Sequence, residues 1–273
     1  MKAFIKNEYD PIHFSLVAYP CNIGIFDDSN PFYNNFNKAL ALQQYNHLLN
    51  VLIQEDIKFN FLDLINSPSQ VYTRDIGFPI DGLFFISNLT SDDRSLEIRP
   101  LIDYSVQNNL DFYIMKEKVE GGDVFVHNQK IFIGTGGRTT QLAVEEINNK
   151  LMSEKKDFEI IQVLFDISKI HLDCVFNILD ESTCIITNGV FNPIDITKHF
   201  KRVIEVPAKE VASLAANIVN LGNNKILCSN ENFSNLLIKH DYDVTFIDFS
   251  EVIKLKGGLG CCVLPIMRSS KNM

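Results

Sequence analysis

The chain lacks the features that mark several common protein classes. Its formal net charge is −9 and its Lys and Arg residues do not cluster, which argues against a nucleic-acid or anionic-membrane surface. No stretch approaches the roughly 18 to 20 continuous apolar residues of a membrane span. The first residues contain neither an apolar leader segment nor a cleavage pattern. We therefore expect a cytoplasmic location, no nucleic-acid partner and no membrane partner.

Zinc-type cysteine spacing is also missing. The six cysteines form no CxxC or His-Cys pattern, and most lie inside apolar, strand-like runs, which predicts reduced packing residues. Cys261 is the exception, because a glycine-rich stretch precedes it. No linker-like segment interrupts the 273 residues, and a hydrophobic fraction of 46% is ample for a large core. We expect a single domain over residues 1–273, without a metal or another cofactor.

Four segments resemble copies of one strand-turn-strand unit. They begin at Asp75, Asp123, Asp173 and, more weakly, Ala216, and a half unit begins at Cys261. The first three starts are 48 and 50 residues apart, and the half unit follows the third after 88, or two steps of 44. A period near 50 residues is typical of radial or stacked repeats. In a radial arrangement, equivalent positions would converge on the central axis.

Each unit is predicted to continue with a helix and a third strand. Turn-forming residues favour β-hairpins at 81–82, 127–129, 180–182 and 222–224. The apolar spacing over 37–54 predicts a helix, after a strand over 13–20 and a loop long enough to act as a lid. Further helices are expected over 91–109, 139–153, 207–214 and 232–240. With the N-terminal strand, helix and strand closing against the last strand, these elements predict a ring of five modules.

Two segments carry residues suited to covalent chemistry. Cys261 follows Lys-Gly-Gly-Leu-Gly, where the backbone can approach a ligand closely, and we expect it to open a strand at a rim. A thiolate there is a nucleophile if a positive neighbour or a cationic substrate favours it. His171 and Asp173 are two residues apart, so on a strand both would project to one side and Cys174 to the other. A histidine in that place suits proton transfer near neutral pH.

Carboxylates complete the candidate site. Glu120 precedes two glycines that would let the chain turn sharply, and we expect it to orient the imidazole, whereas Asp123 would bond the backbone of its own turn. Asp75 and Asp173 would repel each other in one cavity unless a cation with several N–H donors bound between them, and a guanidinium fits. A divalent metal is the competing interpretation, although such ions usually take more than two oxygen ligands.

Two arginines are candidates for binding a substrate carboxylate. Arg138 opens a predicted helix, where the helix dipole disfavours a positive charge that a ligand carboxylate would compensate. The same reasoning applies with less force to Arg94, for which a solvated surface position is the alternative.

In order and approximate spacing, these motifs resemble the guanidine-modifying (pentein) superfamily of arginine deiminases, dimethylarginine dimethylaminohydrolases and amidinotransferases. The resemblance covers nearly the whole chain and implies an α/β fold, a five-bladed α/β propeller of ββαβ modules with pseudo-fivefold symmetry. The motifs are YTRD (72–75), EGGD (120–123), IGTGGRTT (133–140), HLDCVF (171–176) and GGLGC (257–261).

The resemblance also implies the catalytic roles. Cys261 would be the nucleophile, His171 the general acid and base, and Glu120 the partner of His171. The thiolate would attack the guanidinium carbon of a small arginine-like substrate, leave a thiouronium on the cysteine and give a ureido product such as citrulline after hydrolysis. An acceptor amine in place of water would make the enzyme an amidinotransferase.

By the same resemblance, Asp75 and Asp173 would hold the guanidinium nitrogens, while Arg94, in an Arg-x-x-Glu stretch, and Arg138 would hold the substrate carboxylate. Gly260 stands where many deiminases carry an arginine, which leaves the identity of the guanidino compound open.

Two other functions remain alternatives. A non-catalytic binding propeller would keep the fold without the chemistry, and a thiol peptidase would share the cysteine and the histidine. A homodimer is a candidate assembly. A redox pair of adjacent cysteines at the C-terminal end is disfavoured, because neighbours on a strand point to opposite sides.

Overall fold

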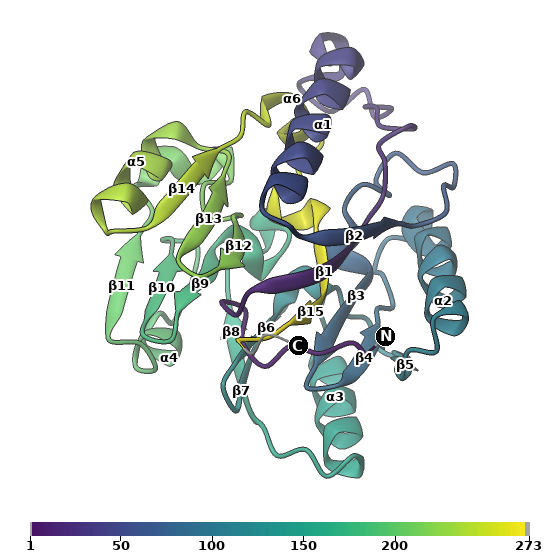
Figure 1. Cartoon of the computed structure of the whole chain (residues 1–273), viewed down its shortest axis with the longest axis vertical. Helices are drawn as coiled ribbons and strands as arrows, with labels where there is room; N and C mark the ends of the chain where they lie inside the picture. The colour runs from purple at the N-terminus through teal and green to yellow at the C-terminus, as the bar shows by residue number, and fades with distance from the viewer. Residues whose placement is uncertain (1, 271–273) are drawn as a thin grey trace.

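The computed structural model describes residues 2–270 and contains five three-stranded sheets that share one topology (Figure 1). In each sheet the middle strand pairs antiparallel with one neighbour and parallel with the other. In four sheets this pattern follows from a hairpin and a longer connection to a third strand, because only the longer connection allows parallel pairing; in the remaining sheet the antiparallel pair joins strands from the two ends of the chain. The five sheets therefore correspond to the five predicted modules.

The strands of the sheets, grouped in sheet order, are β15 (Leu264–Arg268), β1 (Ile12–Val17) and β2 (Lys58–Phe61); β3 (Gly77–Ile80), β4 (Leu83–Ile86) and β5 (Phe112–Ile114); β6 (Val124–His127), β7 (Lys130–Thr135) and β8 (Glu159–Leu164); β9 (Phe176–Asp180), β10 (Thr183–Ile186) and β11 (Arg202–Glu205); β12 (Val219–Gly222), β13 (Lys225–Cys228) and β14 (Asp243–Phe246). The first sheet joins strands from the two ends of the chain, β1 and β15, as predicted.

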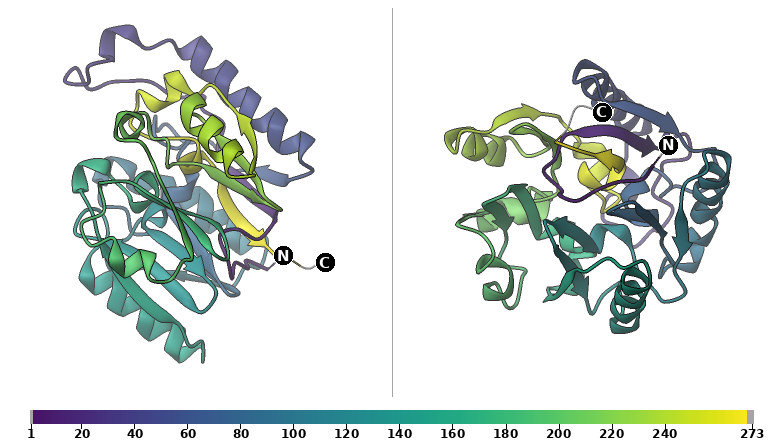
Figure 2. Two further views of the ribbon diagram at one scale, coloured as in Figure 1. Left: turned by 90° about the vertical axis from the view of Figure 1, so that its left-hand side faces the viewer. Right: turned by 60° about the horizontal axis from the view of Figure 1, so that its bottom comes forward.

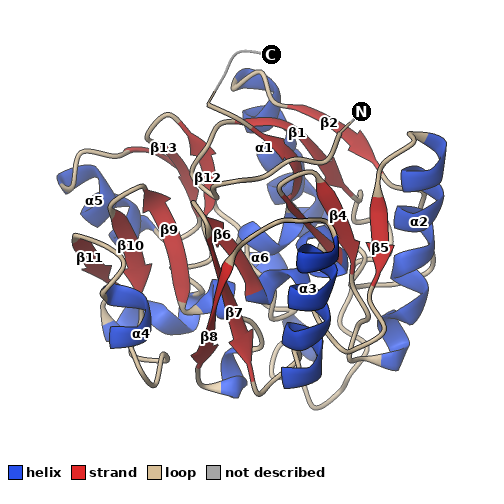
Figure 3. Ribbon diagram, turned by 90° about the horizontal axis from the view of Figure 1, so that it is seen from below, coloured by secondary structure: helices blue, strands red, loops and turns tan. Residues whose placement is uncertain are grey.

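Helices lie on the outside of the sheets (Figures 1 and 3). They are α1 (Lys38–Gln54), α2 (Ile98–Gln107), α3 (Gln141–Ser153), α4 (Ile194–Thr197), α5 (Glu231–Lys239) and α6 (Ser250–Ile253). The right-hand view of Figure 2 shows the modules arranged around the C-terminal segment, drawn in yellow. Among residues 2–270, no helix combines the length and the apolar character that crossing a bilayer requires.

Each of five buried apolar clusters joins two sheets. One cluster packs β3 and β4 against β6 and β7, and the others pair the third sheet with the fourth, the fourth with the fifth, the fifth with the first and the first with the second. Each sheet therefore packs against two others through the faces of its strands. Burial of these apolar surfaces is the main favourable term that holds the modules together.

All four predicted hairpins are present, and three of them have turn residues at positive φ; in the turn at 180–182, which has none, the Ser182 N–H donates to Asp180 Oδ1 at 2.7 Å. Asp81 and Gly82 have φ values of 40° and 95°, and Asn128, Asn223 and Asn224 also lie in this region. Helix α1 begins where predicted, since the side chain of Asn37 accepts a hydrogen bond from the Leu40 N–H.

Two helix predictions were inaccurate. The segment predicted over 91–109 is divided into a 3-10 turn at Asp92–Glu97 and α2, because Pro100 cannot donate the hydrogen bond that a continuous helix needs. The segment over 207–214 contains only a 3-10 stretch, Ala208–Ser213, and the helix of that module is α4. A helix of four residues is too short to produce a readable apolar period.

Candidate active site

Four 3-10 turns, each just before the first strand of a module, contain three of the seven predicted site residues and directly follow two more, Glu120 and His171. They are Thr73–Ile76, Gly121–Asp123, Leu172–Cys174 and Gly260–Cys262. The prediction that Cys261 and the His171 segment lie on strands was therefore wrong, and strand alternation does not apply. As a result, Cys174 lies on the same cavity as Cys261.

A cavity of about 120 Å³, the inner cavity, brings the predicted residues together. Five of them line it: Asp75, Arg94, Arg138, His171 and Cys261. The other two adjoin it, since a carboxylate oxygen of Asp173 lies 3.7 Å from the Cys261 sulfur and Glu120 contacts His171 from behind. All seven side chains thus form one cluster, although the first and last are far apart in sequence.

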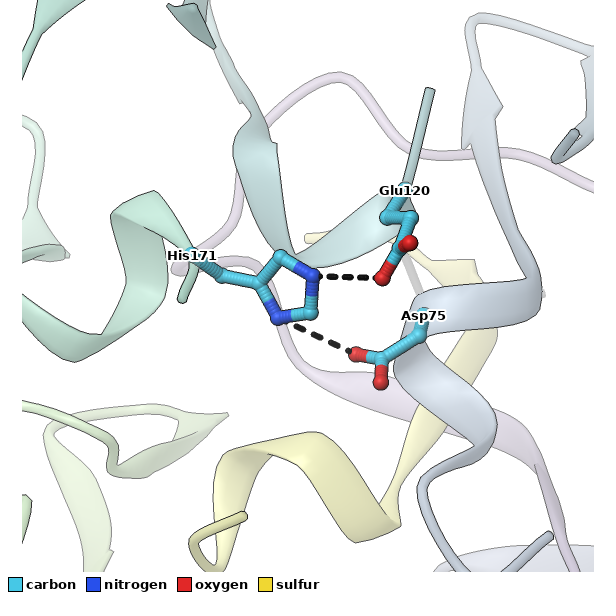
Figure 4. Close-up of side chains that lie close together, drawn as sticks. All are labelled: Asp75, Glu120 and His171. Atoms are coloured by element: carbon cyan, nitrogen blue, oxygen red, sulfur yellow. Dashed lines mark hydrogen bonds and ion pairs between the residues drawn. The ribbon is translucent and has the colours of Figure 1, made fainter. Parts of the chain in front are cut away.

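His171 lies between two carboxylates (Figure 4). Its Nε2 is 2.7 Å from Glu120 Oε2, and its Nδ1 is 3.6 Å from Asp75 Oδ1. Burial disfavours a charged ring, but Asp75 and the hydrogen bond to Glu120 outweigh burial and raise the pKa of His171 to about 10. Burial alone would raise the pKa of Glu120, yet the hydrogen bond and charge of His171 lower it to about 2. The pair is therefore an imidazolium and a carboxylate at neutral pH.

Glu120 is held on its other oxygen. Arg138 Nη1 donates to Glu120 Oε1 at 3.2 Å, and the Thr90 backbone N–H donates to the same atom at 3.0 Å. The fully buried carboxylate has partners on both sides, as a buried charge requires. Arg138 therefore supports the partner of the imidazole while its side chain remains 30% exposed toward the cavity.

Arg94 was predicted to bind the carboxylate of a substrate, but its guanidinium already pairs with two carboxylates of the protein. Its Nη1 donates to Asp75 Oδ2 at 2.7 Å, and its Nε and Nη2 donate to Glu97 Oε2 at 3.0 and 2.8 Å. The surface alternative is also wrong, since only 12% of the side chain is exposed. Within residues 2–270, Asp75 Oδ1 has no hydrogen-bond partner. Arg94 thus fixes one oxygen of Asp75, while the other faces His171 Nδ1 at 3.6 Å without a hydrogen bond.

The Cys261 sulfur is in an anionic environment. Burial raises the pKa of the Cys261 thiol well above its ordinary value, and Asp173 and Asp75 add to this effect. Burial likewise raises the pKa of Asp173, despite the opposing charge of His171. Without a further positive charge, the site therefore favours the thiol over the thiolate. A bound cation would reverse that preference.

Two glycines of the motifs leave space for side chains. A Cβ on Gly122 would lie 3.0 Å from the His171 ring, and one on Gly257 would lie 2.2 Å from the Tyr72 ring. The sharp turn expected after Glu120 is present as the 3-10 turn Gly121–Asp123, without a positive φ, whereas Gly136 has φ 99°. Gly257 allows close approach as predicted, but the group that approaches is a protein side chain.

Asp123 has a structural position, as expected, although its partners differ from the prediction. Its Oδ1 accepts the backbone N–H of Leu172 at 2.8 Å and its Oδ2 accepts the Thr139 hydroxyl at 2.6 Å. Asp123 therefore connects its own module to the next one and does not bond the backbone of its own turn. Burial raises the pKa of Asp123 to about 7.

Three side chains of the cluster have the composition of a metal site. Ligand atoms of Asp75, Glu120 and His171 all lie within 4.8 Å of one another. However, the two ring nitrogens of His171 face two different carboxylates, an arrangement that a protonated imidazole satisfies on both sides. A metal ion would take only one ring nitrogen and would compete with Arg94 and Arg138 for the carboxylates.

A wider cavity of about 670 Å³, the outer cavity, shares Arg138, Ile170 and Lys256 with the inner one. Asn30 and Phe32 of the predicted lid loop also line it. The loop therefore borders the outer cavity, and its action as a lid stays a prediction.

The sequence matches, over residues 18–268, the model of a family described as N,N dimethylarginine dimethylhydrolase, eukaryotic. The uncharacterized protein YkgA of Bacillus subtilis is 29% identical, over 98% of this chain and 96% of its own length. An N(G),N(G)-dimethylarginine dimethylaminohydrolase of Mycobacterium tuberculosis is 24% identical, over 94% and 84% of the two chains.

Solved structures share the fold. The N-terminal domain of ArgZ, described as a cyanobacterial arginine dihydrolase, superposes with a TM-score of 0.84 at 18% identity, over 96% of this chain and 99% of that one. SxtG, an amidinotransferase of Microseira wollei, gives a TM-score of 0.80 at 14% identity, over 97% of each chain. The arrangement of five small sheets is therefore that of known α/β proteins.

Proposed function

Because the chain belongs to the family described as N,N dimethylarginine dimethylhydrolase, within the guanidine-modifying superfamily, we propose that it is a cysteine-dependent hydrolase of a guanidino C–N bond. The substrate is a small arginine-like molecule, and the products are a ureido compound and an amine or ammonia. The observation that carries this proposal is the inner cavity, where a thiol, a charged imidazole and two carboxylates converge.

The carboxylates recognise the guanidinium. Asp75 Oδ1, which has no hydrogen-bond partner among the described residues, and Asp173 accept its N–H groups. The positive charge of the substrate offsets the two carboxylates that otherwise keep Cys261 protonated. Binding thereby favours the thiolate only when the reacting carbon is in place, and the thiol proton passes to solvent water because His171 is already protonated.

Covalent chemistry then proceeds in two steps. The Cys261 thiolate attacks the guanidinium carbon and His171 gives its proton to the departing nitrogen, so that a thiouronium remains on the cysteine. His171, now neutral, takes a proton from water, and the resulting hydroxide attacks the same carbon. The C–S bond breaks, and the ureido product leaves. Glu120 stabilises the charged imidazole at both ends of the cycle.

Arg138 is the better of the two candidates for the substrate carboxylate. It borders both cavities and retains exposure, whereas Arg94 already binds two protein carboxylates. We assign Arg94 chiefly to the orientation of Asp75. A contact between Arg94 and substrate would require its pairing with Asp75 or Glu97 to change.

We extend the proposal to the whole chain. Five sheets whose core clusters link each sheet to two others support a closed five-bladed propeller and a single domain. A cytoplasmic location and a homodimer stay predictions.

A substrate panel tests the function. Arginine, dimethylarginine, agmatine, citrulline and guanidinoacetate are incubated with wild type and with Cys261→Ser, and ureido product and amine are quantified. We expect turnover of at least one guanidino compound, a loss of about 1,000-fold or more in the variant, and no effect of a chelator. Weaker turnover of agmatine than of arginine would support a carboxylate contact. If wild type and variant are equally inactive on every compound, the chain is a binding module.

Amidino transfer is the second candidate, favoured by the size of the outer cavity. An acceptor amine could occupy that space while the thiouronium forms. The same panel, supplemented with glycine or ornithine, distinguishes the two reactions, since transfer would produce a new guanidino compound instead of a ureido one.

A further inference from the structure

Asn217 is an uncharged side chain that contacts both the backbone N–H and the sulfur of Cys261. Its Oδ1 accepts the Cys261 backbone N–H at 3.2 Å, and its Nδ2 lies 3.4 Å from the Cys261 sulfur. Nδ2 also lies 3.5 Å from the backbone oxygen of Asp173. The backbone N–H requires an acceptor, which fixes Oδ1 on that side of the amide and leaves Nδ2 as the amide atom nearer to the sulfur, since Oδ1 lies 3.6 Å from it. Only 1% of Asn217 is exposed.

The chain around the cysteine is shaped to admit this amide. A Cβ on Gly258 would lie 2.5 Å from Asn217 Oδ1, and one on Gly260 would lie 3.1 Å from the same atom. In addition, the Gly260 N–H donates to the Asn217 backbone oxygen at 3.2 Å. Two of the three glycines before Cys261 thus leave room for the Asn217 side chain.

The repeat points to the same residue, one position after the predicted start of the fourth unit at Ala216. Asn217 lies 44 residues after Asp173 and 44 before Cys261, at the position that Asp75 and Asp123 occupy in their modules. Every module therefore contributes one polar or nucleophilic side chain at this position, and the fourth contributes an amide. A carboxylate in this place would add a further negative charge beside the sulfur.

We propose that Asn217 is a positioning residue that holds the backbone of Cys261 through Oδ1 and stabilises its thiolate through an N–H donated to the sulfur. This inference rests on the proposed function of Cys261 as the nucleophile. The groups that face the sulfur otherwise disfavour a negative charge: Asp173, Asp75 and Cys174. Tyr72 and Cys262 are also near and are neutral when protonated. The amide compensates for part of this environment until the cationic substrate arrives.

The test measures the thiol itself. Carbamidomethylation of the Cys261 peptide by iodoacetamide is followed by mass spectrometry as a function of pH, in wild type, Asn217→Ala and Asn217→Asp. The aspartate variant retains an acceptor for the backbone N–H but lacks the amide donor. Asn220→Asp is the matched control, because Asn220 is an equally buried amide that bonds Ile178 and Leu179 oxygens and not Cys261.

We expect Asn217→Ala to shift the midpoint of the alkylation profile upward by about one pH unit and to lower the rate at pH 8 by about 10-fold or more, which is the size of one hydrogen bond to a charged group. Asn217→Asp should shift the midpoint further, because it also places a negative charge beside the sulfur. The control should keep the wild-type midpoint. A wild-type midpoint in folded Asn217→Ala, or an equal shift in the control, would overturn the proposal. Because alkylation requires no substrate, an inactive wild type would contradict the proposed function and leave this readout intact.

Discussion

At the scale of single residues, the charge of His171 has a consequence for stability. The pKa of His171 is raised to about 10 from 6.5, chiefly by Asp75 and Glu120 against burial, so its stabilising contribution is complete below pH 6.5 and is lost as pH rises through 10. The pKa of Glu120 is lowered to about 2 from 4.5, so its contribution is complete above pH 4.5 and is lost as pH falls through 2. The pair is therefore most stabilising between pH 4.5 and 6.5.

The variant His171→Gln should remove this dependence. We expect it to lower the unfolding free energy by about 3 kcal/mol near pH 6, because two buried carboxylates lose their shared cation. The difference from wild type should shrink as pH approaches 10. Denaturant unfolding at pH 6, 8 and 10 measures it. Parallel stability curves for the two proteins would show that the ring is neutral in the folded state.

The identities of the site residues could be predicted, but their pairing could not. Asp75, Glu120 and His171 could be selected because they stand at repeat starts or in glycine-rich motifs. The ion pair of Arg94 with Asp75 depends on the fold, since nineteen residues separate them. The Arg-x-x-Glu stretch did carry a signal for Glu97, because residues three apart are neighbours on a helical turn.

At the scale of elements, the turn before His171 is strained. Ile170 has φ 69° and ψ −62°, and the His171 N–H donates to the Lys169 oxygen at 2.8 Å, which together define a γ-turn with positive φ. A β-branched residue in this conformation costs on the order of 1 to 3 kcal/mol. The turn sets the direction in which the imidazole leaves the backbone.

Ile170→Gly should therefore separate stability from activity. Relief of strain should leave the unfolding free energy unchanged or raise it by about 1 kcal/mol, while looser placement of the imidazole lowers kcat/KM about 10- to 100-fold. Asn109→Gly, at another positive φ far from the site, is the control that should keep full activity. Wild-type kcat/KM in Ile170→Gly would mean that the turn does not position His171.

Elements could be predicted where a local rule decides them. Three of the four predicted hairpins follow from Asp, Asn and Gly at positive φ, and α1 follows from its apolar period and its Asn37 cap. The 3-10 turns that carry the site could not be predicted, because three or four residues show no period. The prediction of a strand at 171–174 therefore pointed the side chain of Cys174 away from the cavity that it lines.

At the scale of the whole molecule, the number of modules could be predicted from the sequence, whereas the shape of the cavities could not. Five sheets correspond to five repeat units, and β15 completes the sheet that β1 begins. The outer cavity could not be predicted, because its lining combines the lid loop, Arg138 and residues near Leu214 and Ile253, which only the fold brings together. Equivalent turns meet at the centre because each module repeats one connection.

The most direct test of the account is to trap the covalent intermediate. Wild type is mixed with the best substrate of the panel, quenched in acid during turnover, and analysed by intact mass and peptide mapping. The account predicts an added mass equal to substrate minus the departing amine, located on Cys261 and absent from Cys261→Ser. Rapid turnover without an adduct on Cys261, or with the adduct on Cys174, would contradict it.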